Sequence, residues 1–255
     1  MSNPVAGSLE PGRPRAAGLV VGFVALQILA TAAFFWPLPA RLGTTLPHDL
    51  VDPALNTWIL WWNGQHWPLT AAWWDAPIFQ PQRGALAFSE TLLGLWPVAA
   101  PLQWAGLSAV QTYNLLFLAS FPLCGLAMFL LVRSHTGDSP AAAVAGAAYA
   151  FSAYRLEHLA HLQVLAAFGA PFALLGLEQF RVSRRPVWLA VFGLAWMQQA
   201  LTSGYWLAAA TLLVAGWIVW FGRGPDRGIV GPILAGWSVA ALGVLPVLQI
   251  GRAHV

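Results

Sequence analysis

Long apolar runs, separated by short polar segments, constrain this chain more than any other feature. A helix of about 20 apolar residues spans the hydrocarbon core of a bilayer. Charged residues make up only 8% of the chain, whereas a soluble domain carries roughly 25%. We therefore predict an all-α integral membrane protein with about seven transmembrane helices. The predicted spans are 17–38, 110–132, 139–154, 162–181, 186–202, 205–221 and 228–248.

Charge and cysteine content exclude other classes of protein. The formal net charge is +3, and no basic stripe with interleaved aromatic residues is present, so nucleic acid is not an expected partner. The single cysteine, Cys124, lies in an apolar run and excludes a disulfide framework. The first apolar run is too long for a signal-peptide core. The bilayer is the expected partner.

Arginine placement predicts the orientation, because cytoplasmic loops of membrane proteins are enriched in basic residues. A cytoplasmic N-terminus in the inner or plasma membrane leaves only Arg41, Arg83 and Arg155 outside. Residues 91–107 are apolar but contain two prolines, and a span there would invert every later loop. We therefore expect them to form an interfacial or re-entrant helix. The inside arginines are then Arg13, Arg15, Arg133, Arg181, Arg184, Arg185, Arg223 and Arg227.

This topology leaves a long outer loop, residues 39–109, and loops of that length are usually functional. Asp52 followed by Pro53 predicts a helix start with Asp52 as N-cap, running to about Trp67. We predict that the tryptophans of this helix form an interfacial stripe. Ser89 is expected to cap a second juxtamembrane helix that starts at Glu90.

Polar residues of the outer side fall into three segments. Carboxylates are general-base candidates, and imidazole or guanidinium groups suit an anionic leaving group. Since burying charge in a bilayer is costly, we expect these groups at the outer interface or in one shared wet cavity. The segments carry His48, Asp49, Asp52 and Asn56; then Glu90; then Tyr154, Arg155, Glu157, His158, His161 and Gln163.

The order of these elements resembles the GT-C class of multi-spanning membrane glycosyltransferases. That class includes protein O-mannosyltransferases, oligosaccharyltransferase catalytic subunits and lipid A aminoarabinose transferases. The segments D-P-A-L-N-T-W at 52–58, F-S-E at 88–90 and Y-R-L-E-H-L-A-H at 154–161 are similar to segments of uncharacterised bacterial members. The resemblance covers most of 17–248.

The resemblance implies transfer of a sugar from a polyprenyl-phosphate carrier to an acceptor on the outer face. It implies that an early loop aspartate is the base on the acceptor hydroxyl. Many members have Asp-Glu or Asp-Asp there, whereas this chain has Asp52-Pro53, so Asp49 is an alternative base. Glu90 is the third catalytic candidate. Expected substrate-binding or phosphate-binding residues are Arg155, His158, His161 and Asn56.

Structural roles compete with each of these assignments. Asp52 and Glu90 suit the first turn of a helix, and Glu157 and His161 suit an i, i+4 pair. His158 and His161 with a nearby carboxylate are also candidates for a divalent metal. For the whole chain, the alternatives are a multi-spanning transporter and a membrane scaffold without chemistry. Ionisable residues at span ends, with no internal repeat, favour the enzyme over the transporter.

The last six residues, I-G-R-A-H-V at 250–255, read as a translated sequencing adapter. Codons that encode them match the start of a common adapter, with a stop codon next. We therefore expect a transmembrane domain over 1–249 that continues in the natural protein, and we exclude the tail from fold reasoning.

Overall fold

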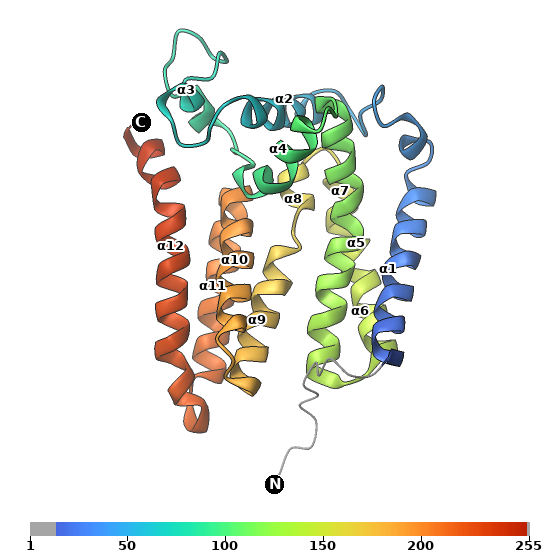
Figure 1. Ribbon diagram of the computed structural model, residues 1–255, viewed down its shortest axis with the longest axis vertical. Helices are drawn as coiled ribbons and strands as arrows, with labels where there is room; N and C mark the ends of the chain where they lie inside the picture. The colour runs from blue at the N-terminus through green and yellow to red at the C-terminus, as the bar shows by residue number, and fades with distance from the viewer. Residues whose placement is uncertain (1–13, 254–255) are drawn as a thin grey trace.

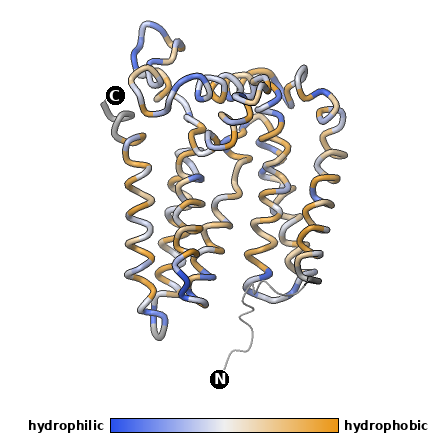
Figure 2. Tube along the Cα trace, in the orientation of Figure 1, coloured by the Kyte–Doolittle hydropathy of each residue, from blue (hydrophilic) through white to orange (hydrophobic). Residues whose placement is uncertain are grey.

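The computed structural model describes residues 14–253, and within that range every regular element is a helix. Figure 1 shows the long helices running side by side, and Figure 2 shows that their bodies are apolar and that polar residues gather at their ends. Arg13, which is predicted to lie on the cytoplasmic side, and residues 254–255 of the tail lie outside the described range. The architecture is that of an all-α membrane protein.

Five segments are long and apolar enough to cross a membrane. Two of them are whole helices, α5 (Ala109–Thr136) and α11 (Gly204–Phe221), and a third, Ala17–Phe34, is most of α1 (Pro14–Phe34). Leu162–Ser183 comprises α8 (Leu162–Leu165) and α9 (Gly169–Ser183). Asp226–Leu248 comprises most of η4 (Gly224–Ile229) and of α12 (Val230–Ala253).

Two of the predicted spans form shorter helices, α6 (Ser139–Ala150) and α10 (Val187–Thr202). The run predicted over 139–154 ends early because the chain turns at Phe151 before α7 (Ala153–Glu157) begins. Helix α10 is apolar, but it is shorter than the five candidate spans. Both helices run alongside their longer neighbours in Figure 1.

Small residues let α5 and α6 approach closely. A Cβ added at Gly146 would lie 2.6 Å from the Gly125 carbonyl oxygen and 2.7 Å from the Phe23 ring. Phe23 of α1 stacks on Phe129 of α5, with ring centroids 4.7 Å apart. Close approach of backbones at small residues is a common way to pack helices in a bilayer, and here it brings α6 against α5 and α1.

The chain between α1 and α5 lies at one end of the bundle (Figure 1). We call residues 38–104 the α2–α4 layer. It contains η1 (Leu38–Arg41), α2 (Asp52–Gln65), α3 (Ala71–Trp74), η2 (Ala85–Phe88), η3 (Leu93–Leu95) and α4 (Trp96–Trp104). Helix α4 has nine residues, too few to span.

Indole N–H groups hold the α2–α4 layer together. Trp62 donates to the Trp73 carbonyl at 2.8 Å, and Trp73 donates to Asn63 Oδ1 at 2.7 Å. Trp96 donates to the Asn63 carbonyl at 2.9 Å. The tryptophan stripe of α2 therefore does not simply lie in the interface as predicted: Trp62 is buried with Ile59, and Trp61 is exposed.

A cluster of ion pairs closes the opposite end of the bundle. Both carboxylate oxygens of Glu178 accept from Arg181, at 3.0 and 2.6 Å. Arg181 also donates to Asp226 Oδ2 at 3.2 Å, and Arg184 donates to Asp226 Oδ1 at 3.1 Å. The cluster joins α9 to η4.

Candidate functional site

The first turn of α2 meets the start of α8 at a carboxylate–imidazole pair. His161 Nε2 lies 2.9 Å from Asp52 Oδ2, and each side chain is 39% exposed. Asp52 is the first residue of α2 rather than its N-cap, and Val51, at the cap position, makes no side-chain cap bond. The predicted capping role is therefore wrong, because the carboxylate turns to a distant histidine instead of to its own helix.

The predicted pairing of Glu157 with His161 is also wrong. It assumed a continuous helix through both residues, but α7 ends at Glu157 and α8 begins at Leu162. The break turns His161 toward α2, where it meets Asp52. Its other ring nitrogen, Nδ1, is buried and has no partner among the described residues.

Asp49 and His48 form a second carboxylate–imidazole pair beside the first. Asp49 Oδ2 lies 2.8 Å from His48 Nδ1, and Asp49 Oδ1 accepts from the Val51 backbone N–H at 2.9 Å. That backbone hydrogen bond is the main reason why the pKa of Asp49 is lowered, and the imidazoles of His48 and His161 lower it further. A lowered pKa makes Asp49 a weaker proton acceptor than an ordinary aspartate.

A buried phenol interacts electrostatically with both aspartates. The Tyr113 side chain, from the first turns of α5, is fully buried, and its hydroxyl has no hydrogen-bond partner among the described residues. Sequence reasoning missed Tyr113, although the capping box of Ser108 and Gln111 that starts α5 is a readable signal for the start of that helix.

The other predicted binding residues have different surroundings. Asn56 is buried and donates to Gln163 Oε1 at 3.0 Å, so it fastens α2 to α8 beneath the pair. His158 is half-buried; its Nδ1 lies 2.7 Å from the Tyr154 carbonyl, and its ring packs on Tyr154 and His161 at 4.3 and 5.6 Å. His158 therefore lies beside the Asp52–His161 pair, with Nε2 left for another partner.

Arg155 does not face this site. It is 2% exposed and donates to the carbonyls of Ala150 and Leu165, at 2.8 and 2.9 Å, and to Ser120 at 3.2 Å. Its guanidinium also lies 4.6 Å from the Phe121 ring centroid. The predicted phosphate contact is corrected accordingly: the donors of Arg155 tie α5, α6 and α8 together below the surface.

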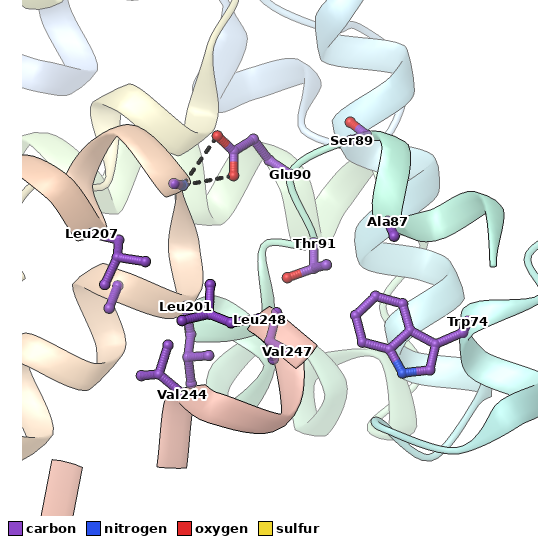
Figure 3. Close-up of a pocket in the computed structure, with 12 residues that line it drawn as sticks. Trp74, Ala87, Ser89, Glu90, Thr91, Leu201, Leu207, Val244, Val247 and Leu248 are labelled. Atoms are coloured by element: carbon purple, nitrogen blue, oxygen red, sulfur yellow. Dashed lines mark hydrogen bonds between the residues drawn. The ribbon is translucent and has the colours of Figure 1, made fainter. Parts of the chain in front are cut away.

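Glu90 has different partners from the two aspartates: Asp49 and Asp52 pair with imidazoles, whereas Glu90 contacts the α10–α11 turn. No helix starts at Glu90: the next helical turn, η3, begins at Leu93, and Ser89 is instead the C-cap of η2, where its backbone N–H donates to the Leu86 carbonyl. Glu90 accepts from the Gly204 backbone N–H at 2.9 and 3.2 Å and from Ser203 Oγ at 3.1 Å. Its carboxylate therefore caps α11 and lines a cavity (Figure 3) that Asp49 and Asp52 do not line.

No group of three or more His, Cys, Asp or Glu side chains within residues 14–253 is arranged to hold a metal ion. His158 and His161 lie together, and Asp52 pairs with His161. The arrangement offers a carboxylate oriented by an imidazole, which is the geometry of a general base and its orienting partner.

Comparisons with known proteins do not assign a family. No protein-family model, curated protein or solved structure matches this chain. The resemblance to GT-C glycosyltransferases therefore remains a hypothesis based on three short segments and their order.

Proposed function

We propose that this protein is a GT-C-like membrane glycosyltransferase, which moves a sugar from a polyprenyl-phosphate carrier to an acceptor on the outer face. The observation that carries the proposal is the partly exposed Asp52–His161 pair at the end of an apolar helical bundle. An exposed carboxylate, oriented from one side only, supports proton abstraction at the membrane surface.

In this proposal Asp52 is the base. His161 binds Oδ2, which leaves Oδ1 to accept the proton of the acceptor hydroxyl. The hydroxyl oxygen then bonds to the anomeric carbon, while the bond from that carbon to the phosphate oxygen breaks and the phosphate keeps the electron pair. His158, beside the pair, is the candidate to stabilise that charge, because an imidazolium donates to phosphate oxygens.

The orientation belongs to the same proposal. We place the N-terminus in the cytoplasm of a bacterial cell and the α2–α4 layer outside, with α6 and α10 crossing the membrane to give seven spans. Arg133, Arg181, Arg184 and Arg185 lie at the ends and turns of α5, α9 and α10, at the bundle end opposite the α2–α4 layer. Basic residues gather on the cytoplasmic side of membrane proteins.

The test is transfer from radiolabelled polyprenyl-phosphate sugars in membranes that contain the protein. Asp52→Asn preserves shape and removes the base, so we expect transfer to fall by about 10²–10⁴-fold. Asp49→Asn is the matched control: the same chemical change in a neighbouring carboxylate, with a much smaller expected loss. Immunoblots of washed membranes check that each variant is inserted.

Two outcomes would contradict the proposal. Transfer that is unchanged in Asp52→Asn would remove the base from the mechanism. Failure of the wild-type protein to transfer from any donor would favour the transporter or the scaffold and make the outer carboxylates structural.

A further inference from the structure

We infer that the bundle end opposite the α2–α4 layer binds the headgroup of an anionic glycerophospholipid. The site lies where the α9–α10 turn meets the start of η4, and its ligands are Arg185, Arg223 and Arg227. The inference goes beyond the proposed sugar transfer and does not depend on it, since the outer carboxylates take no part.

A hydrogen bond between distant segments brings these arginines to one place. Arg184, in the α9–α10 turn, donates to Asp226 of η4 at 3.1 Å. Arg185 follows Arg184 directly in the chain, and Arg223 and Arg227 stand on either side of Asp226 in the sequence. The three arginines therefore surround a single joint between α9 and η4.

This joint carries an excess of positive charge. Residues 178–185 and 223–227 contain five arginines but only two carboxylates. Arg181 and Arg184 already bind both of those carboxylates. The other three arginines are exposed, and within residues 14–253 their side chains form no hydrogen bond or ion pair. A guanidinium presents a fork of N–H donors that matches the oxygens of a phosphate group.

The neighbours of these arginines show that the ligand is amphipathic. Val187, two positions after Arg185, is 56% exposed, and Trp220, three positions before Arg223, is 77% exposed. Figure 2 shows the polar turns at this end directly below the apolar bodies of the helices. Indole side chains collect where the hydrocarbon of a bilayer meets its headgroups. The arginines therefore lie at headgroup depth, beside surfaces that acyl chains cover.

A phospholipid with a net negative charge fits both observations. Basic clusters between membrane-spanning helices are a known type of site for anionic headgroups. Phosphatidylglycerol offers phosphate oxygens to the arginines and acyl chains to the apolar surface. Phosphatidylcholine also carries a cationic choline group, which the excess of arginines repels. We therefore assign the site to an anionic lipid such as phosphatidylglycerol.

Lipid binding can be measured on the whole chain in dodecyl maltoside micelles. Native mass spectrometry counts the lipids that stay bound during titration with phosphatidylglycerol or phosphatidylcholine, and gives Kd for each. Glycerol 3-phosphate, titrated by calorimetry, tests the headgroup without its acyl chains. We expect phosphatidylglycerol to bind more tightly than both other probes.

A matched pair of double variants locates the lipid. Arg223→Gln with Arg227→Gln removes two arginines from the joint, and Kd for phosphatidylglycerol should rise about fivefold for each arginine removed. Arg41→Gln with Arg83→Gln makes the same change at two exposed arginines of the α2–α4 layer, and Kd for the tightest lipid should not change. Arg185→Gln tests the α9–α10 turn separately, with an expected rise of about fivefold.

Thermal unfolding shows whether a variant has lost the lipid or the fold. Without added lipid, the double variant of Arg223 and Arg227 should unfold at the wild-type Tm, because neither side chain has a partner in the described fold. Added phosphatidylglycerol should raise the Tm of the wild type more than that of this variant, since a ligand stabilises the state that binds it.

Three outcomes would overturn the lipid site. The first is equal affinity of the wild type for phosphatidylglycerol and phosphatidylcholine. The second is an equal change of Kd in the two double variants, which would leave only a diffuse attraction between the protein and anionic lipid. The third is binding of glycerol 3-phosphate as tight as that of phosphatidylglycerol, which would assign the arginines to a free phosphate.

Discussion

Carboxylates at the two ends of the helical bundle differ in burial and in the number of hydrogen bonds that they accept. At the end opposite the α2–α4 layer, Glu178 is 4% exposed and both of its oxygens accept from Arg181. At the α2–α4 end, Asp52 is 39% exposed and has one imidazole partner. Burial and the arginine close Glu178 to a substrate, whereas a partly exposed carboxylate such as Asp52 retains an open oxygen.

This difference distinguishes carboxylates that stabilise the fold from a carboxylate that is available to a substrate. A buried ion pair leaves an uncompensated charge when one partner is removed, and that loss is costly. A partly exposed pair exchanges its partner for water at little cost. Mutations at the Glu178 end should therefore change stability, and mutations at the Asp52 end should change activity.

Arg181→Ala should produce the largest loss of stability. It leaves Glu178 buried beside the His135 imidazole, whose Nδ1 lies 3.7 Å away, and breaking such a pair costs about 3 kcal/mol. The free energy of unfolding can be measured by SDS titration in mixed micelles. Arg184→Ala is the control, because Arg184 is 47% exposed and pairs with Asp226; its expected cost is below about 1 kcal/mol. Equal losses in the two variants would contradict the distinction between the ends.

Asp52→Asn should change the free energy of unfolding by less than about 1 kcal/mol, because both partners of its pair are partly exposed. The same micelle titration measures it, with His161→Gln as the variant of the partner. A loss as large as that of Arg181→Ala would show that the Asp52–His161 pair is structural, and the comparison between the two ends would fail.

The sequence was sufficient to predict the helical membrane architecture and the start of α2. Apolar runs report directly on burial in lipid, so five predicted spans correspond to long apolar helices in the structure. Asp52 and Pro53 occupy the first two positions of α2, which follows from the local conformational preference of proline. Both predictions depend on neighbouring residues alone.

The hydrogen-bond partners of the polar residues could not be predicted from the sequence, because those partners come from distant parts of the chain. Glu90 caps a helix that begins at Gly204, and nothing near Glu90 in the sequence indicates that contact. Arg155 was expected at the surface, yet its guanidinium turns inward to Ala150 and Leu165. Because the chain breaks between α7 and α8, Glu157 and His161 do not lie one turn apart on a single helix, and His161 pairs with Asp52 instead.

The smallest expected effect is a pH effect at Asp49, and it tests whether Asp49 is the base. Hydrogen bonding to the charged form lowers the pKa of Asp49 below its usual 3.8. A carboxyl group whose pKa is lower in the folded protein stabilises the fold above the unfolded pKa, and this contribution is lost as the pH falls through the folded value. Carboxyl ¹³C NMR of selectively labelled protein gives the titration midpoint.

Val51→Pro removes the N–H that Asp49 Oδ1 accepts, so the pKa of Asp49 should rise toward its usual value. His48→Ala removes the other local partner and should also raise it, by less than Val51→Pro because the Val51 bond is the largest single cause. Transfer by Val51→Pro should stay near that of the wild type if Asp52 is the base. A loss of transfer that follows the Asp49 titration would instead identify Asp49 as the base.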